Sequence, residues 1–556
     1  MASPPTGAGA LVPSEYAAAL AEDSIRDRPG AVMRGRHATP AHRRKPTWLK
    51  LYFLPGLAVV AMAGALRLPF PNAYDIFLDE IYYVDISYSF KNGHYPPHFA
   101  NEGAFLLHPP LLFIIGGFWQ LIIPHGSSYF QLVDSMRLLV AICAMLTALF
   151  IFIIGSRLAN CWVGMAGGLL YSVDPYILRI NGRVLLETMA LMFILAGYLT
   201  FLHLLPSTSI LPTTTLRSES RLHIRPKRQR VYTRAACAGC LLGLGTVSLE
   251  ITGLIVFGPL LVLLWRKWGV ARKTILVALL AAATPYAVYL VSLIITRNWA
   301  SLFYQDRSGF ERFFGIVHTP GSFGVQSQSS LVTKLLDQAP IFGMTYALVA
   351  VGIVAALYLA FQKDGSRKLL AIFTLFGMVT VFYEAAVGAV EEQFLFVLMV
   401  PICASVGIAA HTLAARSDWH RFLRITFVTL FSIVAVYNLG VAIYIRAHPD
   451  NGLNRVVTFV NRDLPDHGVI ATNDLEATFV LEHSDINAIS LTTPRSALKA
   501  HVRYLVIFSA ELVLGYGSFD AQQARFYSSR GRLIFSFKEA TYGKVLIYQS
   551  TAPGAW

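Results

Sequence analysis

Apolar residues along this chain occur in long runs that are separated by short polar segments. A helix of about 20 apolar residues is long enough to cross the hydrocarbon core of a bilayer. We predict a membrane-spanning helix in each of eleven runs: 50–68, 134–156, 161–179, 185–205, 235–249, 251–266, 274–296, 340–361, 369–389, 393–413 and 424–445. The runs 235–249 and 251–266 are short and meet at Glu250, so a single bent hairpin is the alternative there. The pattern predicts a helical polytopic membrane protein.

A twelfth apolar segment, 107–123, decides the orientation of the chain. If it crossed the membrane, the basic loop 206–234 and the basic N-terminal region would lie on opposite sides, against the preference of Lys and Arg for the cytoplasm. The segment also starts with His-Pro-Pro and contains Trp119, which suits a helix lying at the membrane surface. We therefore expect eleven spans, a cytoplasmic N-terminus and an extracytoplasmic C-terminus.

Composition agrees with this topology and excludes two other classes of protein. Of the 556 residues 55% are hydrophobic and 14% are charged, and the mean hydropathy is +0.53. Soluble proteins have about 25% charged residues, so a soluble multidomain enzyme is excluded, and the high hydrophobicity excludes a disordered chain. The net charge of +14 would suggest nucleic acid in a soluble protein. Here most of the excess lies in segments assigned to the cytoplasm, so it indicates orientation in the plasma membrane.

Three regions follow from these patterns. Residues 1–49 are polar and basic, and we expect a disordered cytoplasmic tail before an uncleaved first span. Residues 50–446 form the membrane domain. Residues 447–556 contain ten acidic and ten basic residues, with short β-rich runs at 469–472, 486–491, 504–508, 533–537 and 545–548. Intervening helical stretches predict a small extracytoplasmic α/β domain.

Candidate chemistry lies in the segments assigned to the outer face. In the first outer loop, 69–133, the acid pair Asp79-Glu80 precedes two tyrosines. A carboxylate there is suited to take a proton from an acceptor hydroxyl, and a solvated loop turn is the alternative. Further on, Arg183 and Glu187 lie four residues apart, as on one helix face. Arginine suits bidentate phosphate binding, whereas anchoring among lipid headgroups is the other interpretation.

Three more residues complete the candidates. Arg67 ends the first span on the outer side and Arg137 begins the second, so both break the positive-inside trend. Such arginines either snorkel to the surface or place positive charge at the outer mouth. The outer loop 297–339 is long enough to act as a lid and contains His318, although a lone histidine is more often structural. The five cysteines lie in apolar runs and predict neither disulfides nor a zinc site.

Taken together, these residues resemble a known family. Arg67, Asp79-Glu80, His108-Pro-Pro, Arg137 and the segment 181–187 (NGRVLLE) occur in the order and at spacings similar to those of glycosyltransferase family 39. That family contains protein O-mannosyltransferases and aminoarabinose transferases and belongs to the GT-C superfamily. The motifs cover residues 50–270.

The resemblance implies a GT-C-like membrane fold and an inverting transfer of sugar from a polyprenyl-phosphate donor. The acceptor would be a protein hydroxyl, a glycan or a lipid outside the cytoplasm. It implies Asp79 as the general base and Glu80 as its supporting neighbour. The residues implied for the donor phosphate or the cavity are Arg67, Arg137, Arg183, Glu187 and His108. No cofactor is implied, and no metal is assigned, because a divalent ion is a feature of oligosaccharyltransferase relatives and not of the mannosyltransferase branch.

Departures from the family pattern keep other functions open. The chain has Glu187 where the family has Asp, Glu250 where many relatives have Lys, and Gln393 where relatives often have an Arg-Tyr pair nearby. A transporter or flippase of lipid-linked sugars is one alternative. A non-catalytic sensor of such lipids is another.

Overall fold

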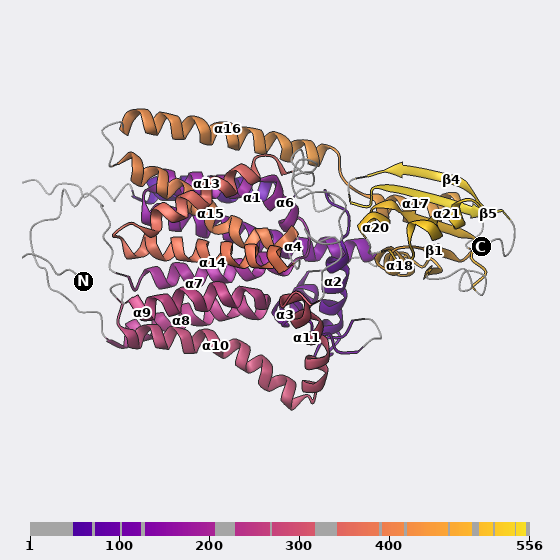
Figure 1. The fold of residues 1–556 in the computed structure, drawn as a ribbon, viewed down its shortest axis with the longest axis horizontal. Coiled ribbons are helices and arrows are strands. Elements are labelled where there is room, and N and C mark those ends of the chain that lie inside the picture. The colour runs from indigo at the N-terminus through magenta and orange to yellow at the C-terminus, as the bar shows by residue number, and fades with distance from the viewer. Residues whose placement is uncertain are drawn as a thin grey trace, which may run out of the picture. The chain divides into compact units, whose positions relative to one another are not determined.

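Helices make up most of the part of the chain that the computed structural model describes, namely residues 48–68, 73–99, 103–123, 128–205, 228–266, 270–316, 342–387, 392–415, 420–464, 468–491, 500–514, 517–539 and 541–551. The helices up to residue 447 are α1 (Trp48–Ala65), α2 (Leu78–Lys91), α3 (Leu111–Ile122), α4 (Tyr129–Leu158), α5 (Cys161–Val173), α6 (Pro175–Asn181), α7 (Leu186–Leu202), α8 (Arg228–Ser248), α9 (Gly253–Arg266), α10 (Arg272–Ile295), α11 (Trp299–Phe313), α13 (Thr345–Ala360), α14 (Gly365–Val387), α15 (Leu395–Ala414) and α16 (His420–Ala447). In Figure 1 the colour runs along these helices in chain order, from indigo through magenta to orange.

Ten of the eleven predicted spans each coincide with one of these helices, and the span 161–179 covers two, α5 and α6. Within the described ranges, five helical stretches are long and apolar enough to cross a membrane alone: those of α4, α10, α14 and α15, and one that begins at Arg421 in α16. The bent pair α6–α7 would make a sixth. The helical character of the segments is therefore confirmed, and the count of eleven spans stays a prediction.

The predicted span 161–179 is wrong in its second half. Helix α5 ends at Val173, and α6 begins at Pro175 with the Asp174 side chain accepting a hydrogen bond from Ile177 N at 3.1 Å. Proline has no backbone N–H to continue a helix, and an Asp N-cap starts a new one. Helices α6 and α7 then meet at 105°. Arg183 lies in this bend, so it does not share a helix face with Glu187 as predicted.

Segment 107–123 contains the short helix α3. Its 12 residues extend about 18 Å, less than the roughly 30 Å of a hydrocarbon core. Helix α3 packs on α2 so closely that a Cβ added to Gly117 would lie 2.9 Å from the Ser87 carbonyl oxygen. Its length agrees with the prediction that this segment does not span.

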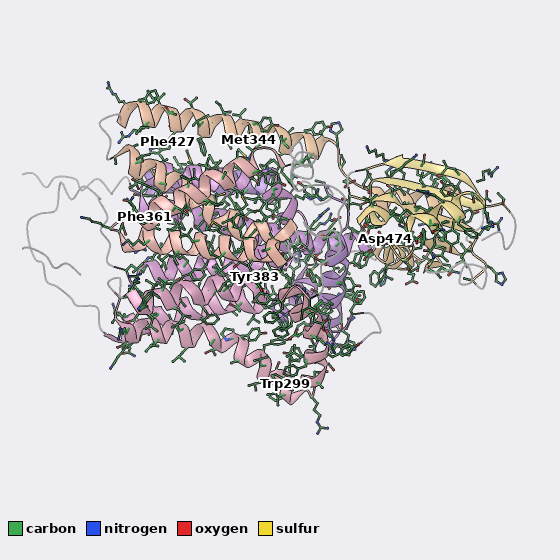
Figure 2. The ribbon with its side chains drawn as sticks, viewed as in Figure 1. Trp299, Met344, Phe361, Tyr383, Phe427 and Asp474 are labelled. Atoms are coloured by element: carbon green, nitrogen blue, oxygen red, sulfur yellow. The ribbon has the colours of Figure 1, made fainter. Side chains whose placement is uncertain are left out.

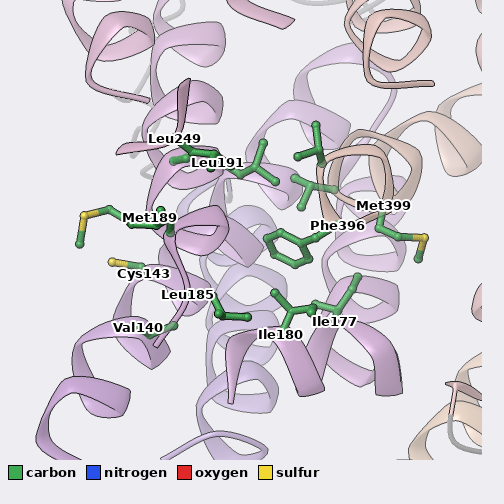
Figure 3. Packing of buried hydrophobic residues seen from close by; sticks show 14 of the residues in the cluster. Val140, Cys143, Ile177, Ile180, Leu185, Met189, Leu191, Leu249, Phe396 and Met399 are labelled. Atoms are coloured by element: carbon green, nitrogen blue, oxygen red, sulfur yellow. The ribbon is translucent and has the colours of Figure 1, made fainter. Parts of the chain in front are cut away.

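The helices enclose a continuous apolar core. Figure 3 shows side chains from α4, α6, α7 and α15 meeting there, among them Val140, Ile177, Leu191 and Phe396. Helices α4 and α5 approach closely, since a Cβ on Gly155 would lie 2.8 Å from the Gly164 Cα atom. This packing fixes the helix ends that carry the site.

The C-terminal region forms a five-stranded sheet with the order β2-β1-β3-β5-β4. Strands β1 (Ile470–Thr472), β2 (Ala488–Ser490) and β3 (Tyr504–Phe508) are parallel, and β5 (Lys544–Ser550) pairs antiparallel with both β3 and β4 (Gly531–Lys538). Helices α17 (Gly452–Asp463), α18 (Leu475–Glu482), α20 (Ser509–Leu514) and α21 (Ala521–Ser528) accompany it. All five predicted β-rich runs are confirmed as strands.

Hydrogen bonds bring distant segments to one end of the helices. The Arg137 side chain in α4 reaches Glu80 in α2, and Val184 N in the α6–α7 bend reaches the same carboxylate. Leu106 N donates to Gln305 Oε1 in α11 at 2.7 Å. Segments predicted to lie on the outer side are therefore neighbours.

Candidate active site

The acid pair of the first outer loop opens helix α2, and its two carboxylates lie in different environments. Glu80 is fully buried, whereas Asp79 is partly exposed. Because successive helix residues point about 100° apart, neighbouring side chains leave the axis in different directions. The prediction of a solvated turn is wrong for Glu80.

Glu80 forms the most highly connected ion pair of the described site. Arg137 donates from Nε to Glu80 Oε1 and from NH2 to Glu80 Oε2, both at 2.7 Å. Val184 N donates to Oε1 at 2.9 Å, and Phe77 N donates to Oε2 at 3.4 Å. Arg137 also donates to the carbonyl oxygens of Tyr74 and Asp75. Such a bidentate, charge-assisted arrangement fixes the start of α2 against α4 and the α6–α7 bend.

Asp79 faces a different partner. Gln393 Nε2, just before α15, donates to Asp79 Oδ2 at 3.2 Å. Gln393 is nearly buried and uncharged, so it orients the carboxylate without an ion pair at this contact. The departure noted at position 393 therefore lies directly beside the candidate base.

His108 lies among acids from four segments. Its Nδ1 is 3.0 Å from Glu250 Oε1. Burial lowers the pKa of His108, but the charge and hydrogen bond of Glu250 and the charges of Asp79 and Glu187 outweigh it and raise the pKa to about 9. Asp306 in α11 is close enough for His108 to lower its pKa, against burial and Glu250, which raise it to about 6. At neutral pH His108 is thus a cation among carboxylates.

Two buried arginines and one half-buried arginine line a cavity of about 150 Å³. Arg67, Arg137 and Arg446 contribute to its wall together with Leu68, Asp134, Leu138, Ala141, Asn181 and Gly182. Arg67 donates to the carbonyl oxygens of Ala63, Tyr171 and Ser172, so the end of α5 holds its guanidinium in place. The cavity therefore brings three guanidinium groups and the Asp134 carboxylate to one place.

The remaining predicted residues lie elsewhere or outside the described chain. Arg183 does not line this cavity; its NH2 donates to Thr541 Oγ1 at 3.2 Å, and its guanidinium lies 4.7 Å from the Phe77 ring centre. Glu187 is buried in the first turn of α7. His318 lies outside the described residues, and the start of its loop, predicted as irregular, forms helix α11.

No protein-family model matches the chain, and no curated protein matches it. Solved structures do. The archaeal oligosaccharyltransferase AglB from Archaeoglobus fulgidus, in complex with an inhibitory peptide and a dolichol-phosphate, is 14% identical, with a TM-score of 0.54 over 91% of this chain and 75% of that chain. Its apo form is 13% identical over the same shares, with a TM-score of 0.56. The chain shares the fold of this oligosaccharyltransferase. ArnT from Cupriavidus metallidurans, bound to undecaprenyl phosphate, is 12% identical over 92% of this chain and 100% of that chain, with a TM-score of 0.49.

Within this fold, sequence reasoning missed two residues of the site. Arg446 was placed at the end of the last span, and its position beside Arg67 and Arg137 depends on how α16 packs. Asp306 was placed in an irregular loop. The signal for Arg446 was a cation at the end of an apolar run. The signal for Asp306 was an amphipathic pattern over 299–313, which indicates a helix.

Proposed function

We propose that the protein is a membrane glycosyltransferase that moves a sugar from a polyprenyl-phosphate donor to an extracytoplasmic hydroxyl. The observation that carries this proposal is the division of the acid pair. Glu80 is buried and paired with Arg137, whereas Asp79 stays partly exposed at the start of the same helix. In support, the archaeal oligosaccharyltransferase that shares the fold was solved with a dolichol-phosphate.

In the proposed reaction, Asp79 accepts the proton of the acceptor hydroxyl. The oxygen attacks the anomeric carbon from the face opposite the phosphate, and the bond from that carbon to the phosphate oxygen breaks. The polyprenyl phosphate leaves with the electron pair, and the anomeric configuration inverts. Arg67, Arg137 and Arg446 would stabilise the charge on the leaving phosphate.

Arg137 connects the two halves of this mechanism. Its guanidinium holds Glu80, the neighbour of the proposed base, and also lines the arginine cavity. Protonated His108 would supply positive charge among Asp79, Glu187 and Glu250. We assign no step of the reaction to a metal.

The test compares Asp79→Asn with the wild-type protein and with Asp85→Asn, a matched control on the same helix. Purified protein in nanodiscs is given radiolabelled undecaprenyl-phosphate mannose and an envelope extract as acceptor pool. A general base typically contributes about 10²- to 10⁴-fold, so Asp79→Asn should lose at least about 100-fold in transfer while keeping its unfolding temperature. Full activity in Asp79→Asn would overturn the proposed base. Lipid scrambling without any sugar transfer would support a transporter instead.

A further inference from the structure

Three carboxylates converge at one end of the C-terminal sheet. Asp474 follows strand β1, Glu476 lies in the first turn of α18, and Glu511 lies in α20, which follows β3. One carboxylate oxygen from each lies within 4.8 Å of the others. Figure 2 shows Asp474 beside α18 and α20. Because β1 and β3 are parallel neighbours, their carboxyl ends meet, and this is the edge at which open α/β sheets bind ligands.

Asp474 supplies a second observation. Its side chain is fully buried, and Oδ1 accepts hydrogen bonds from Glu476 N at 2.8 Å and Ala477 N at 3.0 Å, which caps α18. Its other oxygen, Oδ2, accepts no hydrogen bond from an N–H or hydroxyl group of the described residues, and the side chain that approaches Asp474 is the carboxyl group of Glu476. A buried carboxylate oxygen without a donor is costly. A cation bound between the three acids would satisfy it.

The backbone around the cluster is held in place. The Asn473 side chain donates to Phe508 O at 3.0 Å and accepts from Phe508 N at 2.8 Å, which ties the end of β1 to the end of β3. Asp474 and Glu511 are therefore kept at a fixed separation. A pre-formed arrangement of this kind lowers the entropy cost of binding an ion.

We infer that Asp474, Glu476 and Glu511 bind a divalent cation, and that this cation is Ca²⁺. Oxygen-only ligands select hard cations, and Ca²⁺ binds oxygens at about 2.3–2.6 Å in flexible geometry, so two of its ligands lie at most about 5 Å apart. The three carboxylate oxygens all lie within 4.8 Å of one another, close enough for one such ion to contact each of them. Mg²⁺, at about 2.0–2.1 Å, demands a tighter octahedral arrangement.

The ion would act on the contact between the sheet and the first outer loop. The charges of all three acids act on Tyr542, whose buried hydroxyl donates to Ile76 O at 2.8 Å. Ile76 lies three residues before Asp79. Without a cation, burial and the neighbouring Asp474 raise the pKa of Glu476 to about 10 and that of Glu511 to about 8.

The experiment measures ⁴⁵Ca²⁺ binding to the full chain in nanodiscs after treatment with a chelator. Wild-type protein should bind one equivalent saturably, and Ca²⁺ should raise its unfolding temperature. Glu511→Gln and, separately, Glu476→Gln should weaken binding at least tenfold. Glu482→Gln, an exposed acid on the same helix α18, is the matched control and should bind like wild type. Neither variant removes the Asp474 cap.

Three results would overturn the inference. They are no saturable Ca²⁺ binding by wild type, equal binding by wild type and both glutamine variants, or glutamine variants that unfold at higher temperature while wild type is insensitive to Ca²⁺. The last result would mean that protons shared among the three carboxyl groups, and not a cation, neutralise their charge. The Ca²⁺-binding experiment contains neither sugar donor nor sugar acceptor. Its result therefore does not depend on the proposed transferase activity.

Discussion

Replacement of Glu80 by glutamine should destabilise the protein strongly. Glu80 is fully buried and Arg137 is 4% exposed, so water cannot solvate the arginine once its carboxylate is lost. Removing one partner of a buried ion pair costs about 3–5 kcal/mol. For a domain of 150–250 residues each kcal/mol lowers the unfolding temperature by about 2–4 °C. Multiplying the two values gives the expected decrease in unfolding temperature. Because this chain is longer, we expect a decrease near the lower end of that range, at about 5–10 °C.

The assay is thermal unfolding of the purified protein in detergent, followed by intrinsic fluorescence. Glu311→Gln is the control, because Glu311 pairs with the exposed Arg307 in α11 and should leave the transition unchanged. The double variant Glu80→Gln/Arg137→Met removes the buried charge as well and should recover part of the loss. If Glu80→Gln unfolds at the wild-type temperature, the pair does not hold the start of α2, and the reasoning fails.

Two further predictions concern neighbouring contacts. The pKa of His108 is raised from 6.5 to about 9, so the stability gained from its pairing is complete below pH 6.5 and is lost as pH rises through 9. The unfolding temperature of the wild-type protein should therefore fall between pH 6.5 and 9.5. That of Glu250→Gln should fall less over the same range. An equal decrease in the two proteins would contradict this prediction. Tyr542→Phe removes the hydrogen bond to the Ile76 carbonyl and should cost about 1–3 kcal/mol because a buried acceptor loses its donor. Limited proteolysis should then cleave the C-terminal region faster, and an unchanged rate would refute the contact.

Much of the fold could be predicted because apolar runs and β-rich runs depend on nearby residues. The five strands and the helical character of all eleven segments are of this kind. The break at Asp174 was also readable in principle, since an Asp-Pro sequence is a common helix start. It was missed because hydropathy averages over such local signals.

The site could be predicted only in part. Asp79-Glu80 was found as a pair, but the separate environments of the two acids depend on Arg137, 57 residues away, and on Val184. Asp474 and Glu511 meet because β1 and β3 are neighbours in the sheet. No local pattern encodes strand order, so the cluster could not be recognised from the sequence.

We expect substitutions of the two adjacent acids in the first outer loop to be selected against for different reasons. Asp79 is partly exposed, so a library of substitutions there should yield protein that folds and reaches the membrane but is inactive. At Glu80 the same library should yield little protein at all, because the buried Arg137 would lose the carboxylate that binds it through two hydrogen bonds. A screen for expression alone would therefore tolerate variation at position 79 and reject it at position 80. This pair of residues thus contains one position that folding constrains and one that the proposed chemistry would constrain.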